Sequence, residues 1–225
     1  MKVLVLNGSP KKKSDTMQLT ESFLKGFSEG AEAEIEIMNV IEKEINPCIG
    51  CFGCWIKKEG RCVLDDDQNE LLDKYVEADV VIWSFPLYCF GMPSHLKAVL
   101  DRMIPFVKMD MAQCGDEVRH VSLVNLENKK TVVICGAGFP YSENNFEGVR
   151  ITCNKCFHNP TMVFVPETPL MNLPAAKPLT DVKREQFVQA GKEYALQGCL
   201  KNLTVQMLES LMMPNEEYIR NVNGN

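Results

Sequence analysis

The sequence predicts an α/β fold, a doubly wound five-stranded parallel sheet with helices on both faces. Two observations predict it. Five apolar, β-prone runs recur along the chain, and segments with helical periodicity separate them. Connections between parallel strands are right-handed, so a doubly wound sheet is the natural arrangement. The expected strands are residues 3–6, 34–40, 78–85, 131–136 and 161–165.

The segments between the strands carry the apolar spacing of amphipathic helices. Leu19, Phe23 and Phe27 are spaced by four, and Gly30 suits the end of that helix. The other expected helices cover residues 71–76, a stretch from Pro93 to Ile104, residues 143–157, and a long C-terminal helix from about Asp181 to Leu211 that is broken near Gly198.

The 225 residues are expected to form a single domain, 1–225. No internal repeat or low-complexity linker divides them. Two segments depart from the strand–helix alternation. Residues 47–63 are rich in cysteine, and residues 105–130 form a polar excursion, expected as a hairpin or flap.

Composition excludes several classes of protein. A net charge of −6 argues against a general nucleic-acid binder. No apolar run reaches the length of a membrane span, and no signal-peptide pattern opens the chain. Without a secretion signal, ten cysteines indicate a reducing compartment. We therefore expect a cytoplasmic protein that neither enters a membrane nor binds nucleic acid.

The loop after the first strand has the properties of an anion-binding site. It joins a buried strand to a helix N-terminus, where free backbone N–H groups and the helix dipole favour negative charge. It also holds one glycine, three lysines and several hydroxyl groups. Its candidate ligand-binding residues are Ser9, Lys11, Ser14, Asp15 and Thr16. The alternative reading is a strand–helix turn with a Ser or Asp cap.

A second candidate loop follows the third strand and comprises Pro86, Leu87, Tyr88, Cys89, Phe90 and Gly91. Its apolar and aromatic edge suits a flat heterocycle, although it could also be a hydrophobic turn packed on the next helix. The first loop matches neither the dinucleotide-binding G-x-G-x-x-G nor the P-loop pattern. One phosphate and one flat ring describe a mononucleotide, for which FMN is the common redox case.

The carboxyl ends of parallel strands meet at one edge of a doubly wound sheet, where such folds bind ligands. Three loops are expected there: residues 8–16, 86–92 and 136–141. These loops are candidates for a single site.

The cysteine-rich segment spaces Cys48, Cys51, Cys54 and Cys62 as C-x₂-C-x₂-C-x₇-C. Four thiolates suit an iron–sulfur cluster or tetrahedral zinc. Three thiols at intervals of three resemble cluster-binding runs more than the two separated pairs typical of zinc. A third alternative is that the thiols are free. Cys153 and Cys156 with His158 lack an evident fourth ligand.

The motifs Gly8-Ser9-Pro10-Lys11…Ser14-Asp15-Thr16 and Phe85-Pro86-Leu87-Tyr88…Gly91, with Leu96-Lys97…Asp101-Arg102, resemble the flavodoxin-like NADPH-dependent FMN reductase family. The most similar subgroup is the iron–sulfur flavoproteins, which carry a [4Fe–4S] cluster on a compact cysteine motif. The resemblance implies that the first loop binds the FMN phosphate and the second lines the isoalloxazine ring. Two positions depart from the family pattern: Lys11 stands where Arg is frequent, and Asp15 where Asn is frequent.

The resemblance implies an NAD(P)H-dependent oxidoreductase. Reduced nicotinamide would pass electrons through FMN to a small acceptor such as a quinone, a flavin, a nitro or azo compound, or oxygen. The alternative is an electron carrier that exchanges electrons with a ferredoxin-like partner through a [4Fe–4S] cluster and FMN. A non-catalytic nucleotide-binding module would leave the cysteines unexplained. The resemblance also implies a homodimer or homotetramer.

Overall fold

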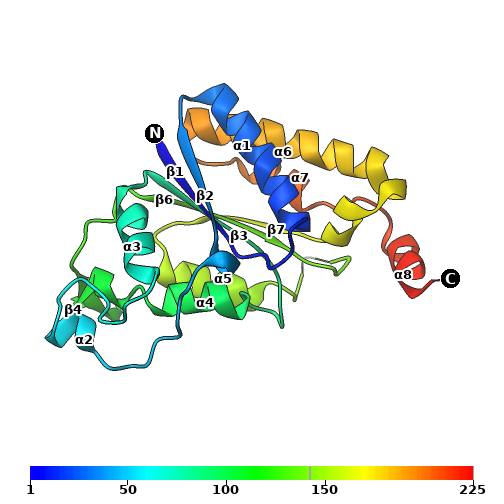
Figure 1. The fold of residues 1–225 in the computed structure, drawn as a ribbon. Coiled ribbons are helices and arrows are strands. Elements are labelled where there is room, and N and C mark those ends of the chain that lie inside the picture. Colours follow the sequence, from blue (N-terminus) through cyan, green and yellow to red (C-terminus); the bar gives the residue numbers. More distant parts are fainter. Residues whose placement is uncertain (142, 225) are drawn as a thin grey trace.

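The computed structural model describes residues 1–141 and 143–224 and contains the expected parallel sheet (Figure 1). Its five strands lie in the order β2-β1-β3-β6-β7, all parallel, which confirms the predicted fold class. The strands are β1 (Lys2–Asn7), β2 (Glu34–Asn39), β3 (Val80–Pro86), β6 (Lys130–Gly136) and β7 (Thr161–Val165).

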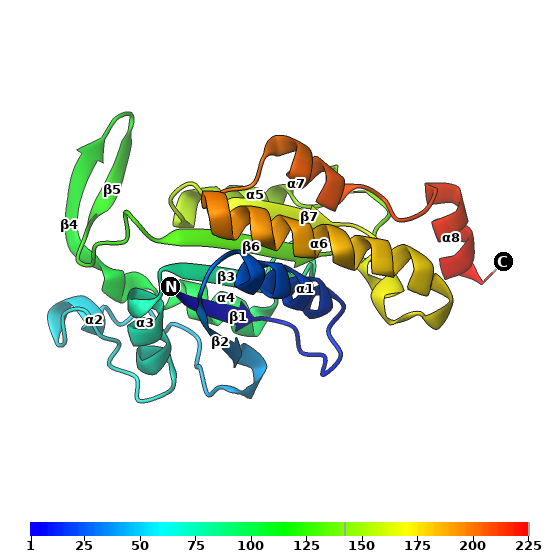
Figure 2. The same ribbon diagram turned by 90° about the horizontal axis from the view of Figure 1, so that it is seen from above.

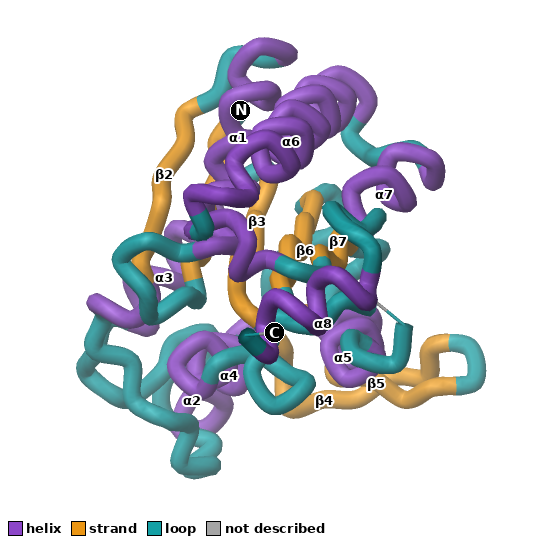
Figure 3. Tube along the Cα trace, turned by 90° about the vertical axis from the view of Figure 1, so that its right-hand side faces the viewer, coloured by secondary structure: helices purple, strands orange, loops and turns teal. Residues whose placement is uncertain are grey.

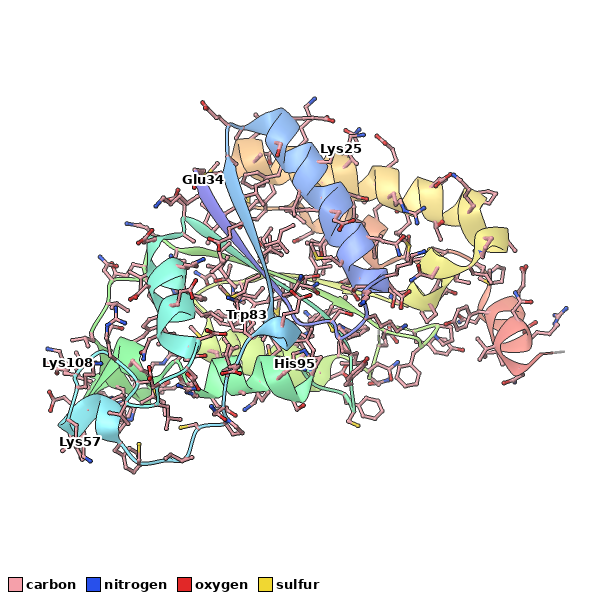
Figure 4. All side chains as sticks on the ribbon, in the orientation of Figure 1. Lys25, Glu34, Lys57, Trp83, His95 and Lys108 are labelled. Carbon is pink, nitrogen blue, oxygen red and sulfur yellow. The ribbon has the colours of Figure 1, made fainter. Side chains whose placement is uncertain are left out.

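Helices cover both faces of the sheet, because each central strand alternates its apolar side chains between the two faces (Figures 1 and 3). On one face α1, α6 and α7 pack against residues such as Val5 and Ile134. On the other face α3, α4 and α5 pack around Trp83, which is labelled in Figure 4. The helices are α1 (Asp15–Gly30), α3 (Gln68–Glu77), α4 (Ser94–Asp101), α5 (Glu147–Cys156), α6 (Lys177–Gln197) and α7 (Asn202–Glu209).

The excursion at residues 105–130 contains an antiparallel hairpin, β4 (Val107–Cys114) and β5 (Glu117–Ser122). It is inserted between α4 and β6 and projects from the body of the molecule (Figure 2). The indole Nε1 of Trp55 donates to the Val107 carbonyl oxygen at 2.7 Å, and its ring packs on His120. Trp55 belongs to α2 (Gly53–Ile56), so the hairpin is fastened to the cysteine-rich segment.

Two helical boundaries need correction. The helix after Pro93 ends at Asp101, so Met103 and Ile104 lie beyond it. The long C-terminal helix begins at Lys177 rather than near Asp181, because Pro178 is tolerated in a first helical turn. The expected break near Gly198 is confirmed, because α6 ends at Gln197 and Gly198 has a φ of 72°. Helices α2 and α8 (Asn215–Asn223) were not predicted from the sequence.

Helices α1 and α6 lie unusually close together because glycines face each other at their contact. A Cβ atom on Gly26 would stand 1.7 Å from the Val188 carbonyl oxygen, and one on Gly191 would stand 1.9 Å from the Phe23 carbonyl oxygen. No side chain can occupy either position unless the helices separate. The contact therefore fixes how α6 covers the sheet.

We predict that Gly26→Ala destabilises the protein by about 1–3 kcal/mol, because a methyl group overpacks the helix contact. Urea unfolding measures the change. Ser28→Ala, at an exposed position of the same helix, is the control and should leave stability within about 0.5 kcal/mol. Equal stability of Gly26→Ala and wild type would show that the helices do not approach this closely.

Candidate functional site

The three expected loops follow neighbouring strands. Strand β3 pairs with β1 on one side and with β6 on the other, so the loops after Asn7, Pro86 and Gly136 share one edge of the sheet. Main-chain hydrogen bonds continue past the strands. The Gly8 N–H donates to the Ser84 carbonyl oxygen at 2.8 Å, and the Leu87 N–H donates to the Gly136 carbonyl oxygen at 2.7 Å. The loops are thereby held beside one another.

The first loop is ordered mainly by its own polar side chains. The Asn7 Oδ1 atom accepts from the Ser9 N–H at 3.0 Å, and the Ser14 hydroxyl accepts from the Met17 N–H at 3.0 Å as the helix cap. The Ser14 hydroxyl hydrogen stays available to a ligand, since accepting uses only an oxygen lone pair. His95, labelled in Figure 4, fixes the loop from α4 through an Nε2 contact of 2.9 Å with the Gly8 carbonyl oxygen.

Thr16 carries the clearest evidence of a ligand in this loop. It is 1% exposed, and among the described residues its Oγ1 atom has no hydrogen-bond partner. A Cβ atom on Gly136 would stand 2.5 Å from this Oγ1 atom, so the hydroxyl lies against the end of β6. A buried hydroxyl without a partner is costly, and an anion at the start of α1 would supply one.

Lys11 and Asp15, the two residues that differ from the family pattern, form an ion pair with each other. Lys11 Nζ lies 2.9 Å from Asp15 Oδ2, and the Asn172 side-chain amide donates to the other carboxylate oxygen. Asp15 therefore has partners of its own beside the helix N-terminus. Hydrogen bonding to Asp15 raises the pKa of Lys11, so the lysine stays positively charged at neutral pH. Asn172 lies 157 residues from Asp15 in sequence, and nothing in the sequence singled it out.

The second loop forms a tight turn in which Tyr88 and Gly91 exchange both main-chain hydrogen bonds, at 2.9 and 3.0 Å. Cys89 and Phe90 at its centre have φ angles of 48° and 61°. Positive φ is unfavourable for residues other than glycine, and such strain often occurs at ligand sites. The exposed Phe90 ring stacks on Phe139 of the third loop, with centroids 5.9 Å apart. The turn therefore presents an aromatic surface at the sheet edge.

The cysteine-rich segment forms a separate pocket on the other side of α4. Cys48, Cys51, Cys54 and Cys62 all line it, together with apolar residues and Arg102. All four thiols are unbridged. Burial raises the pKa of the Cys54 thiol, and the negative charges of Cys62, Cys51 and Cys48 raise it further. The structure thus brings together the four cysteines that the sequence spacing grouped.

The four thiols line the pocket without meeting at a single point. Over residues 1–141 and 143–224, no three His, Cys, Asp or Glu side chains are grouped closely enough to hold one metal ion. Tetrahedral zinc would need all four sulfurs about 2.3 Å from one ion. A [4Fe–4S] cluster takes one thiolate on each iron, so its ligands stand apart around a larger group. Cys153 and Cys156, on α5, form no metal group in the described chain either.

Arg102 also lines this pocket, a position that the family-like motif containing it did not indicate. Its side chain is 1% exposed and forms a buried ion pair with Asp66, with Nη2 2.8 Å from Oδ1. Its Nη2 also donates to Cys62 Sγ at 3.1 Å. Burial opposes ionisation of Asp66, but hydrogen bonds from Arg102 and Asn46 outweigh it and lower the pKa of the carboxyl to about 2.

The geometry defines a doubly wound α/β protein with an anion-type loop after its first strand. A family model described as flavodoxin-like fold matches residues 1–159. The chain therefore belongs to the flavodoxin-like family. Within the part of the chain that the structure describes, no helix is both long enough and apolar enough to cross a membrane.

The chain spans about half the length of the curated relatives it matches. An iron–sulfur flavoprotein of Methanocaldococcus jannaschii is 40% identical over 105 residues, 47% of this chain and 53% of the relative. An FMN-dependent NADH:quinone oxidoreductase of Pseudomonas fluorescens is 30% identical over 113 residues, 46% of this chain and 56% of the relative.

A solved FMN-dependent NADH-azoreductase from Bacillus anthracis, in complex with FMN, superposes with a TM-score of 0.62 at 18% identity. The match covers 87% of this chain and all of the azoreductase. An NAD(P)H:quinone oxidoreductase from Methanothermobacter marburgensis gives a TM-score of 0.60 at 20% identity, covering 88% and 98% of the two chains. At these identities the likeness shows a shared fold.

We predict that the Asp66–Arg102 pair makes the folded protein sensitive to acid. The folded pKa of Asp66, about 2, lies below its ordinary value of 3.8. The pair therefore contributes stability above pH 4, about 2 kcal/mol, that is lost as pH falls toward 2. Urea unfolding between pH 6 and pH 2.5 should show Asp66→Asn less stable than wild type, by a margin that shrinks with acidity. A margin independent of pH would contradict this assignment.

Proposed function

We propose that this protein is an FMN-dependent oxidoreductase that passes electrons from NAD(P)H to a small acceptor, such as a quinone or an azo compound. The observation that carries the proposal is the buried Thr16 hydroxyl at the start of α1, which has no hydrogen-bond partner among the described residues. The curated names of an FMN-dependent NADH:quinone oxidoreductase and of several iron–sulfur flavoproteins support the same class of activity.

The residues of this chain would bind and orient the cofactor. FMN, when bound, supplies the redox chemistry, because its ring accepts a hydride and releases electrons. Ser9, Ser14 and Thr16 would donate hydroxyl hydrogen bonds to its phosphate, and Lys11 would add positive charge. The loop from Pro86 to Gly91 would hold the flat ring against apolar side chains and main-chain N–H groups. No acid–base side chain is assigned in this arrangement.

A second candidate function is that of an iron–sulfur electron carrier with a ferredoxin-like partner. The pocket lined by Cys48, Cys51, Cys54 and Cys62 favours it. These thiolates would each bind one iron of a [4Fe–4S] cluster, and the surrounding apolar side chains would keep water away. Assembly as a homodimer or homotetramer and a cytoplasmic location stay predictions.

We predict that Thr16→Val weakens FMN binding about tenfold or more. Valine keeps the shape of threonine but removes a hydroxyl that would donate to a charged phosphate. Fluorescence titration of cofactor-free protein with FMN measures the dissociation constant. Ser22→Ala is the matched control, because the Ser22 hydroxyl bonds only the Gln18 carbonyl oxygen within α1. Unchanged affinity in Thr16→Val would remove Thr16 from the phosphate site.

The visible spectrum of protein purified without oxygen distinguishes the two candidate functions. We expect flavin bands that NADH or NADPH bleaches rapidly, because the enzyme proposal requires direct reduction by nicotinamide. Iron and acid-labile sulfide near four per chain, with slow bleaching, would favour the carrier. A protein purified without flavin that also fails to bind added FMN would contradict both.

A further inference from the structure

The charged end of Arg102 is buried in the wall of the cysteine pocket, directly after α4. Its Nη2 atom lies 3.1 Å from Cys62 Sγ, and Nη1 donates to the Asn46 carbonyl oxygen at 3.0 Å. Both nitrogens also contact the Asp66 carboxylate. The guanidinium of Arg102 therefore joins Cys62 to Asn46 and Asp66, which lie at the two ends of the segment that contains the four cysteines.

Each partner of this arrangement is itself fixed. The buried Gln68 amide donates to the carbonyl oxygens of Val99 and Arg102, at 3.1 and 3.2 Å, and so holds the end of α4. Asn69 accepts from the Cys62 N–H at 2.9 Å and donates to the Cys62 carbonyl oxygen at 3.0 Å. Cys62 is therefore held at its backbone and at its sulfur, whereas Cys48 and Cys51 are exposed.

Only an arginine side chain can make these three contacts at once. A buried charge is costly unless it is paired, and Asp66 supplies that pairing. Pairing alone would not require a guanidinium hydrogen directed at sulfur. Because the fork carries five donors in one plane, Arg102 can satisfy Asp66 and Asn46 and still reach Cys62. A lysine ammonium is a compact point charge and lacks this geometry.

We propose that Arg102 is a positioning residue of the cysteine pocket: it holds the Cys62 sulfur in place and makes the bound cluster easier to reduce. The inference rests on the proposed [4Fe–4S] cluster. One-electron reduction adds one negative charge to the thiolate-bound group. A positively charged hydrogen-bond donor at a ligand sulfur stabilises that charge and raises the reduction potential.

The test uses the full-length protein, purified without oxygen, and a potentiometric titration followed by electron paramagnetic resonance. Arg102→Lys keeps the charge pair with Asp66 but shortens the reach to sulfur. Asp66→Asn/Arg102→Met removes both charges together, so neither is left unpaired. Arg61→Met is the matched control, because Arg61 precedes Cys62 in sequence but pairs with Asp73 at the surface, 2.6 Å away.

We expect the cluster potential to fall in Arg102→Lys, to fall further in the double variant, and to stay at the wild-type value in Arg61→Met. Iron release to a chelator should be faster in the two Arg102 variants. Circular dichroism shows whether each variant is folded. If the double variant does not fold, the potential and iron release of Arg102→Lys alone test the proposal.

Unchanged potential and unchanged iron release in folded Arg102 variants would overturn the proposal while leaving the cluster intact. An equal fall in Arg61→Met would also overturn it, because general charge rather than the hydrogen bond would then be responsible. Wild-type protein that lacks iron and sulfide, even after reconstitution, would overturn the cluster itself and this inference with it.

Discussion

Parallel pairing of β1, β3 and β6 is the constraint on which the candidate flavin site depends. Parallel strands end at one edge, so loops that are far apart in the chain must emerge together. The hydrogen bonds from Gly8 to Ser84 and from Leu87 to Gly136 extend this pairing into the loops themselves. The α1–α6 glycine contact fixes the helical layer above that edge. The pairing of the strands therefore determines how the loops of the site are placed.

Helix α4 connects the two candidate sites. Near its start, His95 contacts the Gly8 carbonyl oxygen of the first loop. Just past its end, Arg102 reaches Cys62. Seven residues separate these side chains, so about 10 Å of helix lies between the two attachments. This short helix therefore links the cysteine pocket to the first loop at the sheet edge through one contact at each end.

Local patterns were sufficient to predict the strands, the main helices and the three edge loops, because apolar periodicity and turn chemistry are local properties. Contacts between distant residues were not predictable in this way. Asn172 reaches Asp15 across 157 residues, and Arg102 reaches Cys62 across 40. Helix α8 was missed because it is short and buries only Tyr218. The cysteine motif could be recognised in the sequence, but the contact of Arg102 with Cys62 could be seen only in the folded structure.

The chain order of the two sites has a consequence for biosynthesis. Every residue that lines the cysteine pocket lies at or before Pro105, and the hairpin that fastens α2 ends at Ser122. The carboxyl edge of the sheet is complete only after β6, β7 and Asn172 have been made. All four thiols and Arg102 are therefore synthesised before the elements that complete the candidate flavin site.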